Sequence, residues 1–179
     1  LTGPSDFGDI YPIVTKWTEF PKRSARRGDI LITVKGSGVG KINVMDADEL
    51  VISRQLMAIR PSGIDARFLY LFLDHRYQYF QSVATGAAIP GISRENVLDL
   101  SILLPPLPEQ QRIVAILDEA FEGLALATAN AEKNLKNAQD LFASYLNSVF
   151  LRTLGTSSEL PLEELTEVRS PITYGVVKP

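Results

Sequence analysis

Residues 36–41, GSGVGK, are the segment of this sequence that comes nearest to a phosphate-binding motif. A P-loop requires the pattern GxxxxGK[ST], but Lys35 stands where its first glycine belongs and Ile42 where its hydroxyl residue belongs. The dinucleotide-binding pattern GxGxxG also fails, because Lys41 replaces the third glycine. Two interpretations stay open: a β-turn that needs positive φ, or a loop whose backbone N–H groups and flanking lysines meet a phosphate backbone.

A second loop of small residues, ATGAAIPGISR, spans residues 84–94. Gly86 and Gly91 allow its backbone to approach a ligand closely, and the apolar side chains of residues 87–89 are suited to contact a thymine methyl group in a DNA groove. The alternative is a simple connection between a helix and a strand.

Charge is distributed unevenly along the chain. The net charge of −3 argues against a nucleic-acid binder, yet residues 16–41 hold seven Lys and Arg against two acidic residues. Because salt screens charges beyond about 10 Å, such a basic stripe attracts phosphate even on an acidic chain; a solvated surface is the alternative. From the stripe and the two loops we predict the DNA contacts Lys16, Lys22, Arg23, Lys35, Ser37, Lys41, Arg54, Gln55, Thr85 and Arg94.

Residues that catalyse reactions or bind metals are not assembled in this sequence. It contains no cysteine, one histidine (His75) without a carboxylate–histidine spacing, and neither the GxSxG nor the HExxH motif. We therefore predict no catalytic residue, no metal ligand and no cofactor of its own. The lack of cysteine is typical of a reducing cytosol, and no apolar run approaches the ~20 residues that span a bilayer, so a cytoplasmic location without membrane contact is expected.

The elements that position the two loops are predicted from apolar patterning. Apolar residues make up 45% of the chain, which is enough for a packed core. Short β-rich runs predict a β-meander, and the helical spacing that follows predicts a helix capped by Asp65 and stopped by Gly86. The expected strands are Asp29–Val34, Lys41–Met45, Leu50–Ser53, Gln55–Arg60 and Leu100–Leu104, and the expected helices are Asp65–Val83 and Arg94–Asp99.

A single long helix is predicted after the proline cluster of residues 105–108. Proline cannot continue a strand, but its fixed φ suits a first helical turn, and no further proline occurs before Pro161. A helix from Glu109 to about Leu154 would be roughly 67 Å long. Its apolar residues recur at steps of four and three with one stutter, which is a coiled-coil pattern. This apolar seam comprises Ile113, Leu117, Ala120, Leu124, Ala127, Ala131, Leu135, Ala138, Phe142, Tyr145 and Val149.

A helix with one apolar seam needs a second helix, either from elsewhere in a longer parent chain or from another copy. The alternative, a helix lying on its own domain, is disfavoured because this helix is too long for a domain of about 100 residues. For the isolated chain we predict an antiparallel homodimer in which the leucine end of the seam meets the aromatic end. The tail from Leu160 to Pro179 is then expected to pack on the partner's first domain.

The segment LPPLPEQQRIVAILD, residues 104–118, resembles the start of the long conserved-region helix in specificity (S) subunits of type I restriction–modification enzymes. GDILITVKGSGVGKINV at residues 28–44 and TGAAIPGIS at residues 85–93 resemble the target recognition domain of that family. PLEELTEVRSPITYGVVKP at residues 161–179 resembles the opening of the next such domain. The resemblance covers essentially the whole chain, and it indicates a fragment or a half-subunit.

The resemblance implies a division of labour. Each recognition domain reads one half of a split target in double-stranded DNA, and two long antiparallel helices act as a coiled-coil spacer between the halves. Modification (methyltransferase) subunits and a restriction (translocase and nuclease) subunit perform the chemistry, so S-adenosylmethionine and ATP are expected on those partner subunits. The polar residues at the junction that family members keep are expected to dock the modification subunit; they are Glu109, Gln110, Gln111 and Arg112.

We therefore expect an α+β chain in which a mixed β/α target recognition domain precedes one long coiled-coil helix. The predicted boundaries are 1–107 for the recognition domain, incomplete at its N-terminus, 108–154 for the helix, and 155–179 for a linker and the start of a second recognition domain. The predicted function is non-catalytic, sequence-specific DNA recognition. The alternative is a coiled-coil adaptor between proteins without DNA recognition, whose binding would not depend on the basic stripe.

Overall fold

The computed structural model describes residues 1–153 and 160–165. The chain divides into two compact units, Leu1–Phe121 and Glu122–Pro179. Most of the predicted linker and second recognition domain, residues 155–179, lies outside the described residues. None of the helices described is both long enough and apolar enough to cross a membrane.

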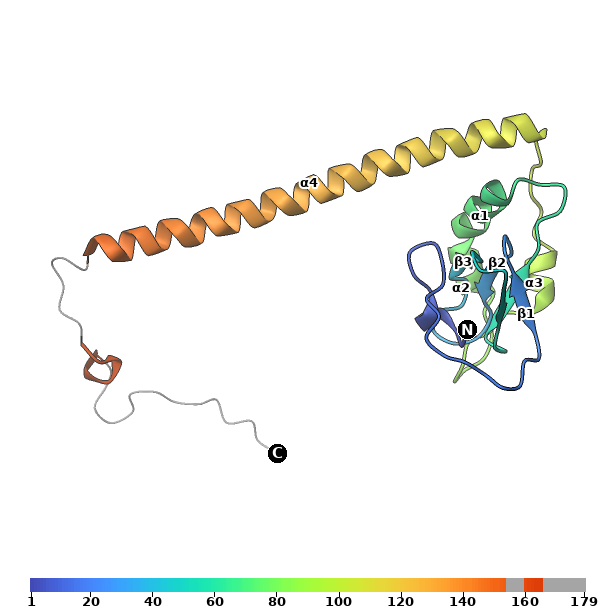
Figure 1. The fold of residues 1–179 in the computed structure, drawn as a ribbon, viewed down its shortest axis with the longest axis horizontal. Coiled ribbons are helices and arrows are strands. Elements are labelled where there is room, and N and C mark those ends of the chain that lie inside the picture. The colour runs from blue at the N-terminus through green and yellow to red at the C-terminus, as the bar shows by residue number, and fades with distance from the viewer. Residues whose placement is uncertain (154–159, 166–179) are drawn as a thin grey trace. The chain divides into compact units, whose positions relative to one another are not determined.

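A three-stranded antiparallel sheet lies at the centre of the first unit (Figure 1). Its middle strand, β2, is buried along its whole length because apolar clusters cover both of its faces: Ile30 and Ile32 belong to one cluster and Leu31 to the other. This alternation is what a strand with two covered faces requires. The sheet consists of β3 (Ile42–Val44), β2 (Ile30–Thr33) and β5 (Leu56–Ile59), in that order.

A second, two-stranded antiparallel sheet pairs β1 (Ser24–Arg26) with β4 (Glu49–Val51). The predicted β-meander is wrong at this point, because β4 leaves the first sheet and β5 takes the place beside β2. Burial explains the pairing: Leu50 lies opposite Ala25, and both pack with Met45 in the second apolar cluster.

The helix predicted over residues 65–83 is two helices, α1 (Ala66–His75) and α2 (Tyr77–Val83). Asp65 is the predicted N-cap, and its side chain accepts the Phe68 N–H at 2.9 Å. The division falls at Arg76, whose N–H bonds to the Leu73 carbonyl three residues earlier instead of four. Leu73 and Phe80, on either side of the break, are both buried in the core cluster of β2.

The segment after α3 (Arg94–Leu98) is not the predicted strand Leu100–Leu104. Leu103 is 92% exposed, so the apolar run does not reflect burial in a sheet. Pro105 and Pro106 follow it, and because proline has no N–H, neither residue can extend a ladder of hydrogen bonds.

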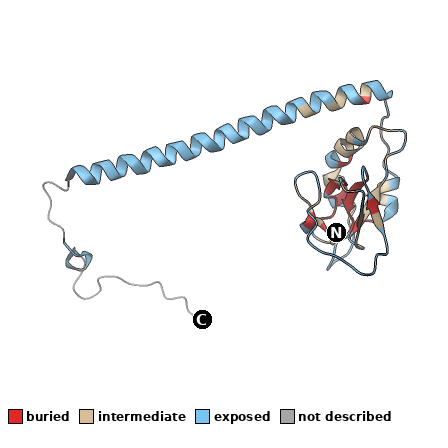
Figure 2. Cartoon of the chain, in the orientation of Figure 1, coloured by how far each residue is buried: buried red, intermediate tan, exposed pale blue. Residues whose placement is uncertain are grey.

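The long helix α4 spans Leu107–Thr153, 47 residues or about 70 Å. It begins two residues before the predicted start. All the buried residues among those described lie in the first unit, in and around its three-stranded sheet for the most part, whereas every residue from 121 to 152 is exposed (Figure 2). Two short 3-10 helices, η1 (Pro4–Asp6) and η3 (Leu162–Leu165), complete the described elements.

A candidate nucleic-acid interface

The two loops of small residues lie side by side in the first unit. Lys35 forms a β-bridge with Gly91, and the Gly36 N–H donates to the Pro90 carbonyl at 2.8 Å. Thr85 forms a second bridge with Gly91 across the base of its own loop. Segments about 50 residues apart in the sequence therefore present their side chains on one surface.

The glycines of the loop GSGVGK fit the β-turn interpretation. Gly40 has φ +82°, and a Cβ there would lie 2.8 Å from the Phe80 Cβ. A Cβ at Gly38 would lie 2.6 Å from the Pro4 Cγ. The backbone N–H groups of Gly36, Gly40 and Lys41 also donate to carbonyls within the domain. If this loop binds phosphate, the lysine side chains are therefore the main groups available to do so.

Five of the predicted DNA contacts line one hollow of about 1080 Å³. Its floor is apolar and includes Leu50, Met57 and Ala58 from the two sheets. The predicted contacts around it are Lys16, Lys22, Arg23, Arg54 and Arg94.

A second hollow of about 480 Å³ adjoins the first, because Arg54 lines both. It is lined by Lys35, which precedes the loop GSGVGK, by residues of the second loop and by the turn before β5. The predicted contacts there are Lys35, Arg54, Gln55 and Thr85. Eight of the ten predicted residues thus gather around two neighbouring hollows, while Ser37 and Lys41 are exposed but line neither.

Most cations of the first hollow have no anionic partner within the described part of the chain. The salt bridges among the described residues involve none of Lys22, Arg23 or Arg54. Lys16 differs, because its Nζ donates to the Thr2 hydroxyl at 3.5 Å and its charge acts on Asp6. Burial opposes ionisation of Asp6, but hydrogen bonds from Thr2 and the charge of Lys16 bring the pKa of this carboxyl below its ordinary value.

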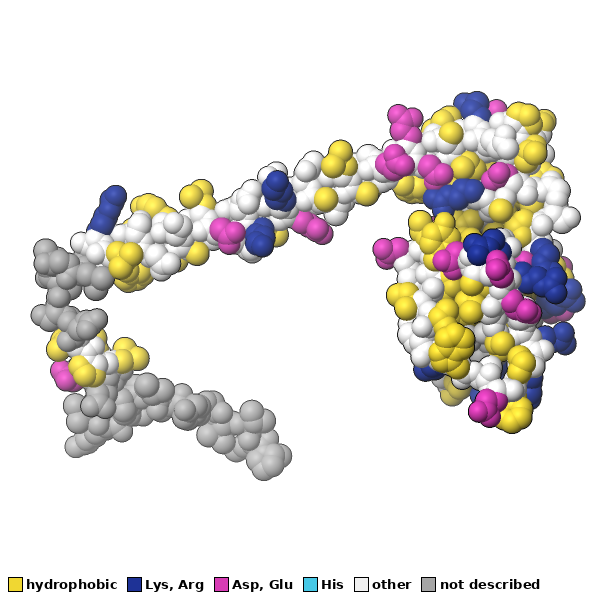
Figure 3. All heavy atoms as spheres, in the orientation of Figure 1, with side chains coloured by type: hydrophobic (Ala, Val, Ile, Leu, Met, Phe, Trp, Pro, Cys, Tyr) yellow, Lys and Arg dark blue, Asp and Glu magenta, His cyan; other side chains and the backbone are white. Residues whose placement is uncertain are grey.

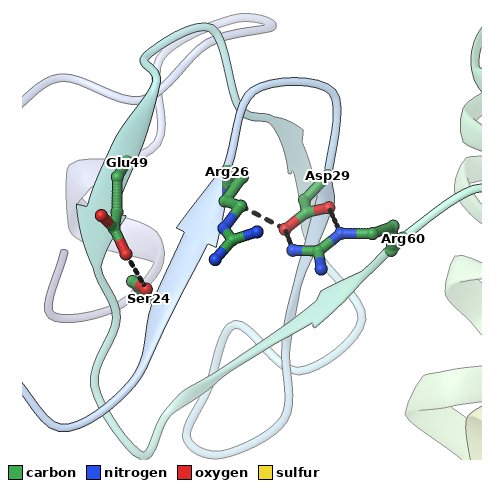
Figure 4. A network of polar contacts seen from close by, with 5 residues as sticks. All are labelled: Ser24, Arg26, Asp29, Glu49 and Arg60. Atoms are coloured by element: carbon green, nitrogen blue, oxygen red, sulfur yellow. Dashed lines mark hydrogen bonds and ion pairs between the residues drawn. The ribbon is translucent and has the colours of Figure 1, made fainter.

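The Asp29 carboxylate binds the side chain of Arg60 and the backbone N–H of Arg26 (Figure 4). The Asp29 carboxylate is 2% exposed and accepts from Nε and Nη2 of Arg60, both at 2.8 Å, and from the Arg26 backbone N–H at 2.9 Å. Burial raises the pKa of Asp29, but these bonds outweigh burial and leave the pKa below its ordinary value. These bonds join the turn between β1 and β2 to Arg60, the residue that follows β5.

The junction with α4 corrects one predicted docking residue. Gln110 is buried, with 2% exposure: its Nε2 donates to the Pro105 carbonyl, and its Oε1 accepts the Asp65 N–H, both at 2.8 Å. Its amide is used inside the chain, so this side chain is not offered to a partner. Gln111 and Arg112 are exposed, and Arg112 forms a bidentate pair with Glu109 at 2.7–2.8 Å.

A second contact also holds the start of α4 on the first unit. The Arg67 guanidinium donates twice to Asp118 Oδ1, at 2.6 and 3.1 Å. Exposure of the apolar seam increases along the helix: Ile113 is half-buried, whereas Leu124 is 68% exposed. Figure 3 shows hydrophobic side chains recurring along the helix with only scattered charges between them.

Sequence reasoning missed two side chains of the first hollow, Trp17 and Phe20. The only signal in the sequence was an aromatic pair placed between Lys16 and Lys22. His75 is exposed at the end of α1, and within residues 1–153 and 160–165 no cluster of three or more His, Cys, Asp or Glu forms a metal site.

Comparison with known proteins gives a consistent result. The family model described as "Type I restriction modification DNA specificity domain" matches residues 20–137. The type I restriction enzyme HindI specificity subunit of Haemophilus influenzae is 29% identical over 132 residues, which are 69% of this chain and 29% of that protein.

Two solved structures share the fold. The crystal structure of the HsdS subunit from Thermoanaerobacter tengcongensis superimposes with a TM-score of 0.61 and 34% identity, over 69% of this chain and 30% of that one. A chain from work on complex assembly and conformational transition of the type I R-M system gives a TM-score of 0.63 and 31% identity, over 83% of this chain and 35% of that one. The chain therefore spans about a third of the length of the relatives it matches.

Proposed function

The chain belongs to the family of the type I restriction modification DNA specificity domain, and on this premise we propose that it recognises one half of a split target in double-stranded DNA for a type I restriction–modification complex. The observation that carries the proposal is the pair of adjoining hollows around Arg54, which gather eight of the ten residues predicted to contact DNA. The adaptor alternative gains no support, since the matched family is defined by DNA specificity.

The proposed roles of the side chains follow from their chemistry. Lysines and arginines without an anionic partner, such as Lys22 and Arg54, neutralise phosphates and set the position of the protein on the duplex. Gln55 and Thr85, in the second hollow, have the donors and acceptors that distinguish base edges. Phosphate contacts thus supply most of the affinity, and the second hollow supplies base discrimination.

The chain is proposed to act without chemistry of its own. No cofactor is assigned to it, and S-adenosylmethionine and ATP are proposed to act on the modification and restriction subunits with which it assembles. The proposed contacts for the modification subunit are Gln111 and Arg112, which are exposed at the start of α4, and the half-buried Glu109. The domain boundaries 1–107, 108–154 and 155–179 are proposed on the same resemblance.

The long helix is proposed to pair with a second helix through its apolar seam. In the isolated chain the partner is a second copy in antiparallel orientation, which would place two recognition domains at opposite ends of the spacer. The exposure of Leu124, Leu135 and Phe142 supports this pairing, because burying a large apolar side chain contributes roughly 1.5–3 kcal/mol of stabilisation that an exposed one does not provide.

Duplex binding by the full chain, alone and mixed with its modification subunit, tests the proposal. Arg54→Ala should lower affinity and reduce the slope of log K against log salt by about 0.9, the value for one lost phosphate contact. Lys136→Ala, on the exposed part of α4, is the control that removes one cation elsewhere. Equal affinities and slopes for the two variants would remove the hollows as the DNA-binding surface.

A further inference from the structure

Residues 13–23, here called the aromatic loop, carry large aromatic side chains that the fold does not use. Trp17 is 92% exposed and Phe20 is 79% exposed, and neither belongs to either of the two core clusters. The loop has no regular secondary structure before β1 begins at Ser24. These side chains are therefore free to contact a ligand without unfolding the domain.

The chemistry around Trp17 selects a ligand that is both aromatic and anionic. Lys16, Lys22 and Arg23 lie on the aromatic loop itself and line the first hollow together with Trp17. Arg54 and Arg94, which line the same hollow, come from segments far along the sequence. Such a concentration of positive charge does not complement a neutral apolar segment of protein, whereas it does complement a nucleic acid.

One carboxylate, Glu49, lines the hollow and offsets the charge of only one of its five cations. Glu49 accepts a hydrogen bond from the Ser24 hydroxyl across the β1–β4 pair (Figure 4). The hollow, at about 1080 Å³, is at the upper end of the volumes typical of ligand sites. Its apolar floor suits the face of a base, and its cationic rim suits the phosphates on either side.

We propose that Trp17 stacks on a base that is unstacked from the bound duplex, with Phe20 beside it and Lys16 and Lys22 on the flanking phosphates. The inference rests on the proposed DNA-binding function and adds a residue that determines specificity. Apolar side chains inserted between base steps kink DNA, and the cost depends on the step, since pyrimidine–purine steps unstack most easily. Trp17 would therefore contribute to sequence preference without reading a base edge.

The experiment uses the fact that Trp17 is the only tryptophan of the chain. Duplex affinity is measured by the anisotropy of labelled DNA, and stacking by quenching of tryptophan emission in the same titration. Permanganate reactivity of thymines reports bases that have left the stack. We expect strong quenching and a new reactive thymine with the wild-type chain. Trp17→Ala should bind about 5- to 150-fold more weakly, the range for loss of one stacked base, and Trp17→Phe should recover part of the loss.

Tyr11→Ala is the matched control, because Tyr11 is an exposed aromatic residue that does not line the hollow. It should leave affinity and reactivity unchanged, and circular dichroism should show all variants folded. Duplex binding with unchanged emission and no reactive thymine would overturn the stacking proposal alone. Emission that is blue-shifted without DNA and depends on protein concentration would overturn it in favour of a second copy on this surface. No duplex binding by the wild-type chain, alone or with its modification subunit, would overturn the proposed function as well.

Discussion

The side-chain oxygen of Gln110 accepts the backbone N–H of Asp65 at 2.8 Å, and this bond joins the first turn of α4 to the N-terminus of α1. The same Asp65 caps α1 through the Phe68 N–H, so one residue organises the start of one helix and the attachment of another. Gln110 also donates to the Pro105 carbonyl, and this bond ties the proline segment to the first turn of the helix that follows it. The start of α4 is thus held on the first unit by this buried amide together with the Arg67–Asp118 pair.

Replacing Gln110 by Ala should destabilise the first unit. The Asp65 N–H and the Pro105 carbonyl would both lose their partner in a partly buried position, and an unsatisfied group that is fully buried costs about 1–3 kcal/mol, so the loss should lie toward the lower end of that range. Gln111→Ala is the control, since that side chain is exposed and should change stability by no more than about 0.5 kcal/mol. Chemical denaturation of the full chain measures the free energy of unfolding of both variants. An equal decrease in the two would show that the hydrogen bonds of the Gln110 amide do not stabilise the fold.

Two glycine substitutions separate backbone strain from packing in the loop GSGVGK. Gly36 (φ +97°) and Gly40 (φ +82°) both have conformations that cost an alanine about 1–3 kcal/mol. Only at Gly40 would the new Cβ also meet the Phe80 Cβ, at 2.8 Å. We expect Gly40→Ala to lower the free energy of unfolding more than Gly36→Ala does. An equal effect would mean that α2 moves aside without cost.

The Asp29–Arg60 pair predicts how stability depends on acid. The folded-state pKa of Asp29 lies below its ordinary value of 3.8, so the carboxylate contributes stability above that pH and loses it as the pH falls through the folded-state pKa. The free energy of unfolding should therefore fall less steeply below about pH 4 in Asp29→Asn than in the wild type. Asp48→Asn, which breaks an exposed pair with Arg27, should keep the wild-type slope.

The central features of the fold follow from local patterns in the sequence. The β-rich run at residues 29–34 had to be a buried strand, and the α1 cap and the long helix were readable from Asp65 and from the spacing after Pro108. Pairing was less predictable: Ser24–Arg26 contains a single apolar residue, and its role as β1 depends on Leu50 arriving from a distant segment. Local sequence does not carry that information.

The candidate site, too, could be predicted only in part from local sequence. Charge and loop composition picked eight residues that the fold gathers around two hollows, but charge alone does not determine this position: Arg27, from the same basic stripe, lines neither hollow and pairs with Asp48. The sequence placed Gln110 among the residues that face a partner, because nothing in EQQR distinguishes it from Gln111. The difference is visible only in the structure, where Gln110 Oε1 accepts the Asp65 N–H. Trp17 was missed because an aromatic residue is normally expected in a core.

The exposed pair Glu109–Arg112 is predicted to matter for assembly and not for stability. Arg112→Ala should reduce co-purification of the modification subunit while the unfolding midpoint stays within error of the wild type, because both side chains are exposed to solvent and such pairs contribute little. Arg152→Ala, near the other end of α4, is the control for loss of one arginine. Undiminished capture by Arg112→Ala would move the docking surface elsewhere.

The seam on α4 predicts the oligomeric state of the isolated chain. Sedimentation equilibrium should give about twice the monomer mass of 19.7 kDa, since a second copy in antiparallel orientation covers the apolar residues that now face solvent. Leu124→Asp should shift the equilibrium to monomer, because Leu124 lies in the seam and a buried carboxylate there would be unpaired. Leu126→Asp is the matched control: its side chain is 65% exposed, close to the 68% of Leu124, but it lies between the seam positions Leu124 and Ala127 and outside the seam, so this variant should stay dimeric. A wild-type monomer at high micromolar concentration would contradict self-association, and dissociation by both substitutions would place the interface on a broader face of the helix.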